Sequence, residues 1–333
     1  MLVAVVFLVL SLALILGSCE VFVNGIEAFG KRLSLHQGIV GSILAAIGTA
    51  LPETLIPIIA IMFSKDAAAH AVGIGAIAGA PFMLGTLAFC VTGAAVIVNA
   101  ALKRRPLAMN VDLSSLKRDL IFFLIFYGIA VATTFVHTHL TIKIIVGVAL
   151  LLSYGIYLKA TFNADGANLG EVDELYLSRY LHLPQGLFWI VLQLVLSLAF
   201  ICLGAHYFVV YVESLAEILA IPALVLSIII TPIATEFPEK LNSIIWVSRH
   251  KDTLALGNIT GAMVFQSCFP VVFGIIFTDW NLCGTTMLSA VLALFSGALV
   301  LGWIHIRKSL SPFLLLVSGL LYVVFLLYVF KVF

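Results

Sequence analysis

Apolar runs of about 20 residues follow one another along nearly the whole chain, with short polar segments between them. A helix needs about 20 mostly apolar residues to cross the hydrocarbon core of a bilayer, where each backbone polar group must be bonded within the protein. The composition agrees, because 63% of the 333 residues are hydrophobic and 10% are charged, whereas soluble domains carry about 25% charged residues. The sequence therefore predicts an all-α polytopic membrane protein surrounded by the lipid bilayer.

The polar breaks divide the chain into ten predicted transmembrane helices. Their approximate ranges are Leu2 to Glu20, His36 to Phe63, His70 to Ala100, Asp119 to Val136, Thr141 to Lys159, Gly186 to Val212, Pro222 to Trp246, Leu254 to Phe277, Cys283 to His305 and Pro312 to Phe330. The first run has no basic segment before it and no small-residue cleavage site after it. We therefore interpret it as a retained span rather than a signal peptide.

The basic residues predict an orientation for these spans. They gather in the connections on one side, and the connections and end on the other side hold only Lys65, Lys143 and Lys331. Because cytoplasmic connections are usually rich in Lys and Arg, we expect a multi-pass protein of the cell membrane with both termini outside the cytoplasm.

The formal net charge of +1 argues against nucleic acid as a partner. The five cysteines lie singly, so we expect no disulfide framework, and we expect no cofactor.

Two stretches of the sequence repeat one another. The motif T-x-x-P-E runs from Thr49 to Glu53 and again from Thr235 to Glu239, 186 residues later. Farther on, GAIAGA at 75–80 matches GNITGA at 257–262 with a shift of 182 residues. A polar segment separates the two halves. We therefore predict a first membrane repeat over residues 1–160, a cytoplasmic linker over 161–184 and a second membrane repeat over 185–333.

The two repeats are predicted to have inverted topology. Each half holds five spans, an odd number, so the second half enters the membrane from the opposite side. Such repeats are typical of secondary transporters, whose substrate site lies near the middle of the membrane between the repeats. Prolines are expected to break the helices there and to free carbonyl oxygens that can bind a cation. These prolines are Pro52 and Pro57, Pro81, Pro232 and Pro238, and Pro270.

Three acidic residues lie well inside predicted spans, namely Glu53, Glu236 and Glu239. An ionised side chain costs roughly 2.5 to 3.5 kcal/mol at the centre of a membrane helix, so such residues usually face a cavity and serve a function. Glu53 and Glu239 occupy equivalent positions, and the repeat symmetry would bring them face to face. Two carboxylates suit a hard metal cation, with further oxygens from Thr49 and Thr235. Alternatively, two protonated glutamates merely bond neighbouring helices.

The motif T-x-x-P-E in two proline-containing helices, each followed by G-[N/A]-I-x-G, resembles the two alpha repeats of the cation/calcium exchanger family, which includes the sodium/calcium exchangers. The resemblance covers the whole ten-span layout. It implies alternating access driven by an ion gradient. It also implies that Glu53 and Glu239 bind the transported ions with help from Thr49 and Thr235.

Several residues depart from the family's pattern. The last position of the family's second motif usually holds an ion ligand. In this sequence it is Leu84 in the first half, whose side chain cannot bind an ion, and Gln266 in the second half, whose amide oxygen is neutral. A serine of the second motif is replaced by Glu236, and Lys240 follows four residues later. This spacing suits a helical ion pair that would leave the other two glutamates as the working site. Alternatively, the Lys240 ammonium faces the cavity and occupies a cation position.

The leading hypothesis is a secondary active antiporter, not an enzyme, that exchanges a small inorganic cation such as Ca²⁺ for Na⁺ or H⁺. Glu53 and Glu239 would bind the two ions in competition. The weaker contributors would be Thr49, Thr235, Glu236, Asn258 and Gln266. One alternative is a degenerate family member that binds ions without transporting them. Another is an intramembrane enzyme with Glu236 and Glu239 as acid and base, although no nucleophile or metal ligand accompanies them.

Overall fold

The computed structural model of the chain describes residues 2–63, 67–136, 139–164, 166, 169, 172–218 and 236–332, and the regular elements in these residues are helices. The first half contains α1 (Leu2–Arg32), α2 (Gln37–Ile39), η1 (Val40–Ala45), α3 (Ala46–Phe63), α4 (Ala67–Met83), η2 (Leu84–Ala88), α5 (Phe89–Ala101), α6 (Leu113–Thr133) and α7 (Leu140–Phe162). After α8 (Tyr176–Leu181) come α9 (Leu187–Ile218), α12 (Phe237–Ser248), α13 (Asp252–Gln266), α14 (Phe269–Phe277), α15 (Gly284–Arg307) and α16 (Pro312–Val332).

Seven helices in the described part of the chain are long and apolar enough to cross a membrane. The outer helices expose large apolar side chains, such as Leu152 of α7, which is 68% exposed, and Leu327 of α16, which is 66% exposed. An apolar surface this extensive is unfavourable in water and suits a lipid environment. The molecule is therefore an all-helical membrane protein.

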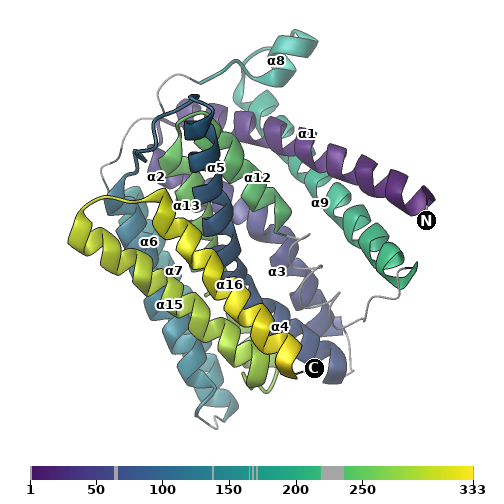
Figure 1. Ribbon diagram of the computed structural model, residues 1–333, viewed down its shortest axis with the longest axis vertical. Helices are drawn as coiled ribbons and strands as arrows, with labels where there is room; N and C mark the ends of the chain where they lie inside the picture. Colours follow the sequence, from purple (N-terminus) through teal and green to yellow (C-terminus); the bar gives the residue numbers. More distant parts are fainter. Residues whose placement is uncertain are drawn as a thin grey trace.

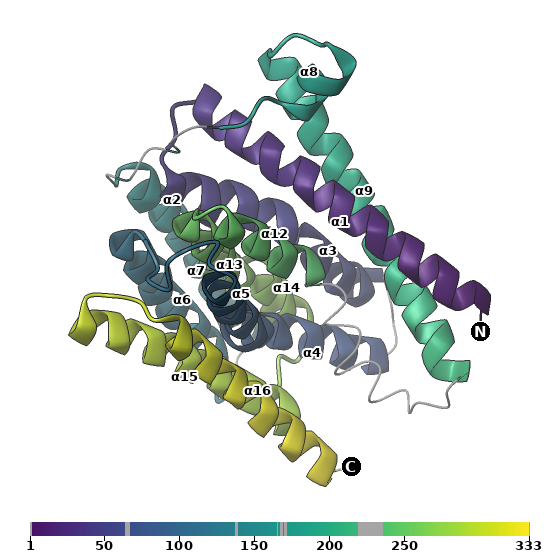
Figure 2. The ribbon, with the colours of Figure 1, turned by 45° about the horizontal axis from the view of Figure 1, so that its top comes forward.

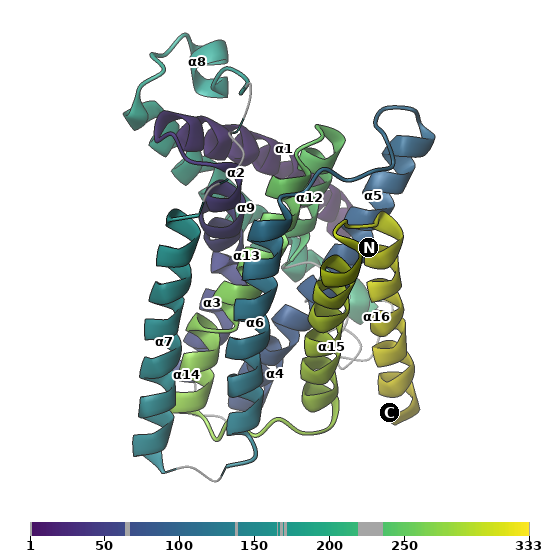
Figure 3. The same ribbon diagram turned by 90° about the vertical axis from the view of Figure 1, so that its left-hand side faces the viewer.

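The elements rich in basic residues lie at one end of the helical bundle. Figure 3 shows α8, the connection between α5 and α6, and the turn between α15 and α16 at this end, whereas the connection between α14 and α15 lies at the opposite end. The turn between α15 and α16 is stabilised by Lys308, whose φ of 51° ends α15 in the left-handed conformation. The α5–α6 connection ends at Asp112, whose side chain accepts hydrogen bonds from Ser114 N and Ser115 N and so caps α6.

Helix α13 forms the centre of the bundle, because every residue from Asp252 to Gln266 is buried. It packs against η1, α3, α6 and α12. Gly257 and Gly261 permit an especially close approach of η1: a side-chain carbon at Gly261 would lie 2.5 Å from Ser42 Cα. No side chain fits in that space. The backbones of the two halves of the sequence therefore meet directly at this crossing.

The carboxylate of Asp119, on α6, stabilises the crossing. It accepts hydrogen bonds from Ser42 Oγ at 2.5 Å, Thr260 Oγ1 at 2.8 Å and Tyr157 Oη at 3.1 Å. Arg118 Nη2 lies 3.7 Å from the same carboxylate. Because the three hydroxyl donors belong to η1, α13 and α7, one buried acidic side chain joins four elements of the bundle.

A buried ion pair fixes the beginning of α13. Arg105, in the α5–α6 connection, places its Nη1 at 2.6 Å and its Nη2 at 2.7 Å from the two carboxylate oxygens of Asp252. Arg105 Nη1 also donates to the carbonyl of Val247 near the end of α12, at 2.8 Å. Two parallel hydrogen bonds between guanidinium and carboxylate are strong and directional. This pair therefore holds the α12–α13 corner against the α5–α6 connection.

Helices α1 and α9 lie side by side along one flank of the bundle (Figures 1 and 2). The prediction that the first span ends at Glu20 is wrong, because α1 continues to Arg32. The polar side chains that suggested an end are bonded to other helices, which the sequence alone does not reveal. Their bonds are Glu20 to Arg249, Asn24 to Gln193, and Glu27 to Trp246 and Lys251.

The prolines interrupt the helices less uniformly than predicted. Pro52 and Pro57 lie within α3, and Pro81 lies within α4, so the expected breaks at these residues are wrong. The departures from α-helical geometry are instead the π-helical segments η1 and η2. Near Pro81, Tyr127 Oη donates to the carbonyl of Ala78 at 2.5 Å.

The second half does break at a proline. Helix α13 ends at Gln266 and α14 begins at Phe269, with Pro270 in the first turn of α14, where its missing N–H group costs nothing. Pro238 lies in the first turn of α12. Pro232 lies outside the described residues.

Exchanging the two repeat-related glycines for alanine tests the crossing of η1 and α13. Gly261→Ala is expected to destabilise the protein by about 3 kcal/mol, because the added carbon meets the Ser42 backbone, which cannot rotate away. Gly79→Ala, 182 residues earlier, is the matched control: no atom lies within 4 Å of its added carbon, so helix propensity alone predicts stabilisation by about 0.5 to 1 kcal/mol. Thermal unfolding in detergent measures both. Equal midpoints for the two variants would contradict the close approach.

Candidate cation site

One buried carboxylate in the described part of the chain has no bonding partner there. Five acidic side chains are buried in those residues, namely Glu27, Asp119, Glu236, Glu239 and Asp252. Glu27, Asp119, Glu236 and Asp252 each bond a basic or hydroxyl side chain. Glu239 is fully buried, and neither of its carboxylate oxygens has a hydrogen-bond partner. An unpaired buried charge is expensive, so Glu239 is the described carboxylate most available to a cation.

The backbone around Glu239 is held by the central helix. Asn258 of α13 donates from Nδ2 to the Glu239 carbonyl at 3.4 Å and places its Oδ1 at 3.2 Å from Thr49 Oγ1 of α3. The Thr49 hydroxyl also lies 3.0 Å from the Ala45 carbonyl. The structure therefore brings together three of the predicted site residues from three helices. Asn258 acts here as the bridge between the two repeats.

Two amide side chains near this carboxylate also lack partners. Gln266, the last residue of α13, and Asn242, three residues after Glu239 on α12, are almost completely buried. Neither the oxygen nor the nitrogen of either amide has a hydrogen-bond partner in the described residues. Leaving such a group unsatisfied costs about 1 to 3 kcal/mol. Three buried polar side chains on the packed helices α12 and α13 are thus left without partners in the described residues.

Glu236 and Lys240 form an ion pair, as one of the two sequence interpretations predicted. Lys240 Nζ lies 3.1 Å from Glu236 Oε2 and 3.3 Å from the Glu236 carbonyl. Both side chains are buried. Glu236 is the N-cap residue of α12, and Lys240 lies one turn later, so the pair follows the helix surface. The ammonium of Lys240 is therefore paired with Glu236.

Two predicted ligands are incompletely described. Glu53 lies in α3, one turn after Thr49, but its side chain is outside the described part. Thr235 lies outside the described residues. Leu84 begins η2 and is buried. The sequence analysis missed Asn242, which is not part of either repeated motif; its only signal is an asparagine inside an apolar helix, three residues after a buried glutamate.

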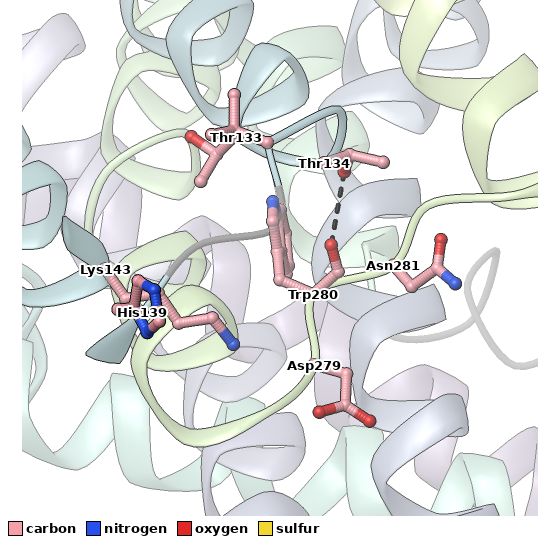
Figure 4. Close-up of a pocket in the computed structure, with 8 residues that line it drawn as sticks. Thr133, Thr134, His139, Lys143, Asp279, Trp280 and Asn281 are labelled. Atoms are coloured by element: carbon pink, nitrogen blue, oxygen red, sulfur yellow. Dashed lines mark hydrogen bonds between the residues drawn. The ribbon is translucent and has the colours of Figure 1, made fainter. Parts of the chain in front are cut away.

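One open cavity of the structure lies away from the predicted site. It has a volume of about 510 Å³ and lies where the end of α6, the start of α7 and the segment before α15 meet (Figure 4). His139, Lys143 and Asp279 line it, while Lys143 Nζ donates to the Thr278 carbonyl at 2.8 Å. Within the described residues, no three His, Cys, Asp or Glu side chains gather closely enough to hold a metal ion. The lining of the cavity combines a single carboxylate, that of Asp279, with the basic residues His139 and Lys143, which does not favour a cation.

Comparison with known proteins identifies the family. The family model described as sodium/calcium exchanger protein matches residues 3–162 and 189–331, which together are most of the chain. The chain belongs to the sodium/calcium exchanger family. Members of this family are membrane-embedded cation antiporters rather than enzymes, which removes the intramembrane acid/base enzyme as an explanation for Glu236 and Glu239.

Known relatives agree with this membership. The chain is 27% identical over 274 residues to the putative antiporter CaxA of Alkalimonas amylolytica, covering 80% of this chain and 78% of the relative. It is 24% identical over 258 residues to the uncharacterized membrane protein MJ0091 of Methanocaldococcus jannaschii, covering 78% and 76%. The solved sodium-calcium exchanger NCX_Mj, soaked with 2.5 mM Na⁺ and 10 mM Sr²⁺, superposes with a TM-score of 0.74 at 21% identity over 97% of both chains. The fold is therefore that of NCX_Mj.

The Glu236–Lys240 pair makes a prediction about stability. Glu236→Gln or Lys240→Met alone leaves the other charge buried without a partner, which is expected to destabilise the protein by about 3 to 5 kcal/mol. The double variant Glu236→Gln/Lys240→Met removes both charges and is expected to recover most of the loss. Thermal unfolding of the purified proteins in detergent measures this cycle. Additive losses in the double variant would show that the two side chains do not stabilise one another.

Proposed function

We propose that this member of the sodium/calcium exchanger family is a secondary active antiporter that exchanges a small divalent cation, such as Ca²⁺, for Na⁺ or H⁺. The observation that supports this function best is the fully buried carboxylate of Glu239, which has no partner among the described residues. The unsatisfied amide oxygen of Gln266, at the end of a central helix, supports the same conclusion. Carboxylate and amide oxygens are the ligands that hard cations prefer.

The charge of the site favours a divalent substrate. Glu236 and Lys240 cancel one another in a bonded pair. Glu239 and Glu53 then contribute two negative charges, if Glu53 faces Glu239 as the repeat symmetry predicts. One divalent cation, or two monovalent ions in its place, would neutralise them. Competition for the same two carboxylates couples the two fluxes, because the protein binds one set of ions or the other.

The proposed architecture is ten transmembrane helices in two inverted repeats of five. The family model matches once in each half of the chain, which supports this division. The equivalent positions Leu84 and Gln266 also support this division. The π-helical segment η2 begins at Leu84, where α4 has just ended, and α13 ends at Gln266. Helices α4 and α13 therefore both lose α-helical geometry at the same point of the repeat. With the basic connections in the cytoplasm, both termini lie outside it in the cell membrane.

Alternating access is proposed to involve α1 and α9. Helix α1 packs against α12, which carries Glu239, and α9 packs along α1 and against α3. Phe22 of α1 packs over Gly48 of α3, beside Thr49. The α1–α9 pair therefore covers the site, and its displacement relative to the rest of the bundle would expose Glu239 to one side of the membrane or the other.

A family member that binds cations without transporting them is the second candidate. Leu84 is buried and offers no ligand where Gln266 is found in the other repeat. Such a protein would show cation-dependent stability and no flux.

Removing the charge of Glu239 tests the proposed site. Glu239→Gln is expected to abolish cation-driven ⁴⁵Ca²⁺ uptake into proteoliposomes and to raise the unfolding temperature in cation-free buffer, because it removes a buried unpaired charge. Glu53→Gln is expected to abolish the same uptake. Asp279→Asn, an equivalent change at an exposed residue, is the control and should retain full flux. Full uptake by Glu239→Gln would refute this assignment of the site.

A further inference from the structure

Asn242 differs from the other buried asparagines of the protein in one respect. Asn24 and Asn258 are also buried, and both use their amide groups in hydrogen bonds to other helices. Asn242 is 0% exposed, and its Oδ1 and Nδ2 have no partner in the described residues. Because an unsatisfied amide destabilises the protein, its presence indicates an occupant that bonds it in the working protein.

The position of Asn242 on α12 directs it toward the site. Residues three apart on a helix lie on the same face, with Cβ atoms about 5 to 6 Å apart, so Asn242 neighbours Glu239. Trp246 continues this stripe one turn later, and its Nε1 donates to Glu27 Oε1 of α1 at 2.9 Å. The stripe of Glu239, Asn242 and Trp246 therefore faces α1.

The opposite surface of α1 cannot satisfy an amide. Between Cys19 and Glu27, the buried residues of α1 include Phe22, Val23 and Ile26, which have no polar side-chain atoms. Asn24, in the same stretch, is engaged by Gln193 of α9 and by the backbone at Tyr176. Asn242 thus has no hydrogen bond to α1 or to the Glu239 carboxylate. The occupant must reach it from the side of Glu239.

We propose that Asn242 is a ligand of the transported cation, shared with Glu239, and that it helps to set the selectivity of the site. The proposal rests on the proposed function. A cation with metal–oxygen distances of about 2.3 to 2.6 Å can bridge a carboxylate and an amide oxygen that are one helical turn apart. The amide nitrogen then donates to water that remains on the cation or to the Glu239 carboxylate. The neutral amide oxygen of Asn242 would replace the ligand that is missing at Leu84. It would add one bond to the cation without adding a negative charge to the site.

Two substitutions at Asn242 and one at Asn258 test the assignment in the full-length protein, with Ca²⁺ as the probe. Thermal unfolding in detergent is measured without and with Ca²⁺, and Ca²⁺ affinity is taken from the concentration dependence of the shift. Asn242→Leu keeps the branching at Cγ and the number of heavy atoms and removes both polar atoms. It is expected to be at least as stable as the native protein without Ca²⁺ and to bind Ca²⁺ on the order of tenfold more weakly. Asn242→Asp adds a charge and is expected to bind Ca²⁺ more tightly relative to Na⁺.

Asn258→Leu is the matched control. It removes a buried asparagine whose partners are known, so it is expected to lower the unfolding temperature even without Ca²⁺. If Asn242→Leu behaves in the same way and keeps native Ca²⁺ affinity, Asn242 is a structural residue and the proposal is wrong. If the native protein binds Ca²⁺ but shows no Ca²⁺ flux in proteoliposomes, the proposed antiport function is wrong. The Ca²⁺ affinities of the Asn242 variants then still decide whether Asn242 is a ligand. If neither Ca²⁺ nor Na⁺ shifts the native protein, both proposals fail.

Discussion

The close approach of α13 to η1 is the constraint on which the rest of the molecule depends. Gly261 leaves no room for a side chain against Ser42, and Asp119 bonds both sides of this contact through Ser42 and Thr260. Because α13 is buried along its entire length, its position fixes that of the helices around it. The hydrogen bonds of Asn258 to Thr49 and Glu239 then follow from the same placement. The geometry of the site is thus a consequence of how the two halves of the chain cross.

The buried charges divide into those that hold the fold and those that remain for a substrate. Asp252 with Arg105, and Asp119 with its three hydroxyl donors, are satisfied by the protein itself. Such pairs offer a cation no free oxygen. Glu239 is different because its carboxylate has no partner in the described residues. Burial alone therefore does not distinguish Glu239 from the acids that hold the fold, whereas burial without a partner does.

The sequence predicted the helical membrane fold, the family and the pairing of Glu236 with Lys240, because these depend on local composition and spacing. It failed where partners are distant in sequence. Glu20 and Glu27 suggested the end of a span, yet α1 passes through them because Arg249 and Lys251, more than 200 residues away, neutralise them. Prolines suggested breaks in α3 and α4, whereas packing keeps both helices continuous. The π-helical segment η1 precedes α3, and η2 follows α4. Asn242 escaped notice because it lies outside the repeated motifs, and only its missing partners distinguish it.

The contacts of α1 link the site to a possible path for the ion. Phe22 lies against Gly48, beside Thr49, and Glu27, farther along α1, bonds Trp246 and Lys251 at the end of α12. The same helix therefore packs beside the candidate site and is tied by charge to the corner that Arg105 and Asp252 hold in place. Helix α9 packs along α1, and Asn24 and Gln193 bond them to one another. If alternating access displaces α1 and α9 together, the apolar contacts of Phe22 can slide over Gly48, whereas the ion pairs of Glu20 and Glu27 must break. The energetic barrier to that motion then resides at the end of the bundle, away from the cation ligands, so that binding and movement are set by different residues.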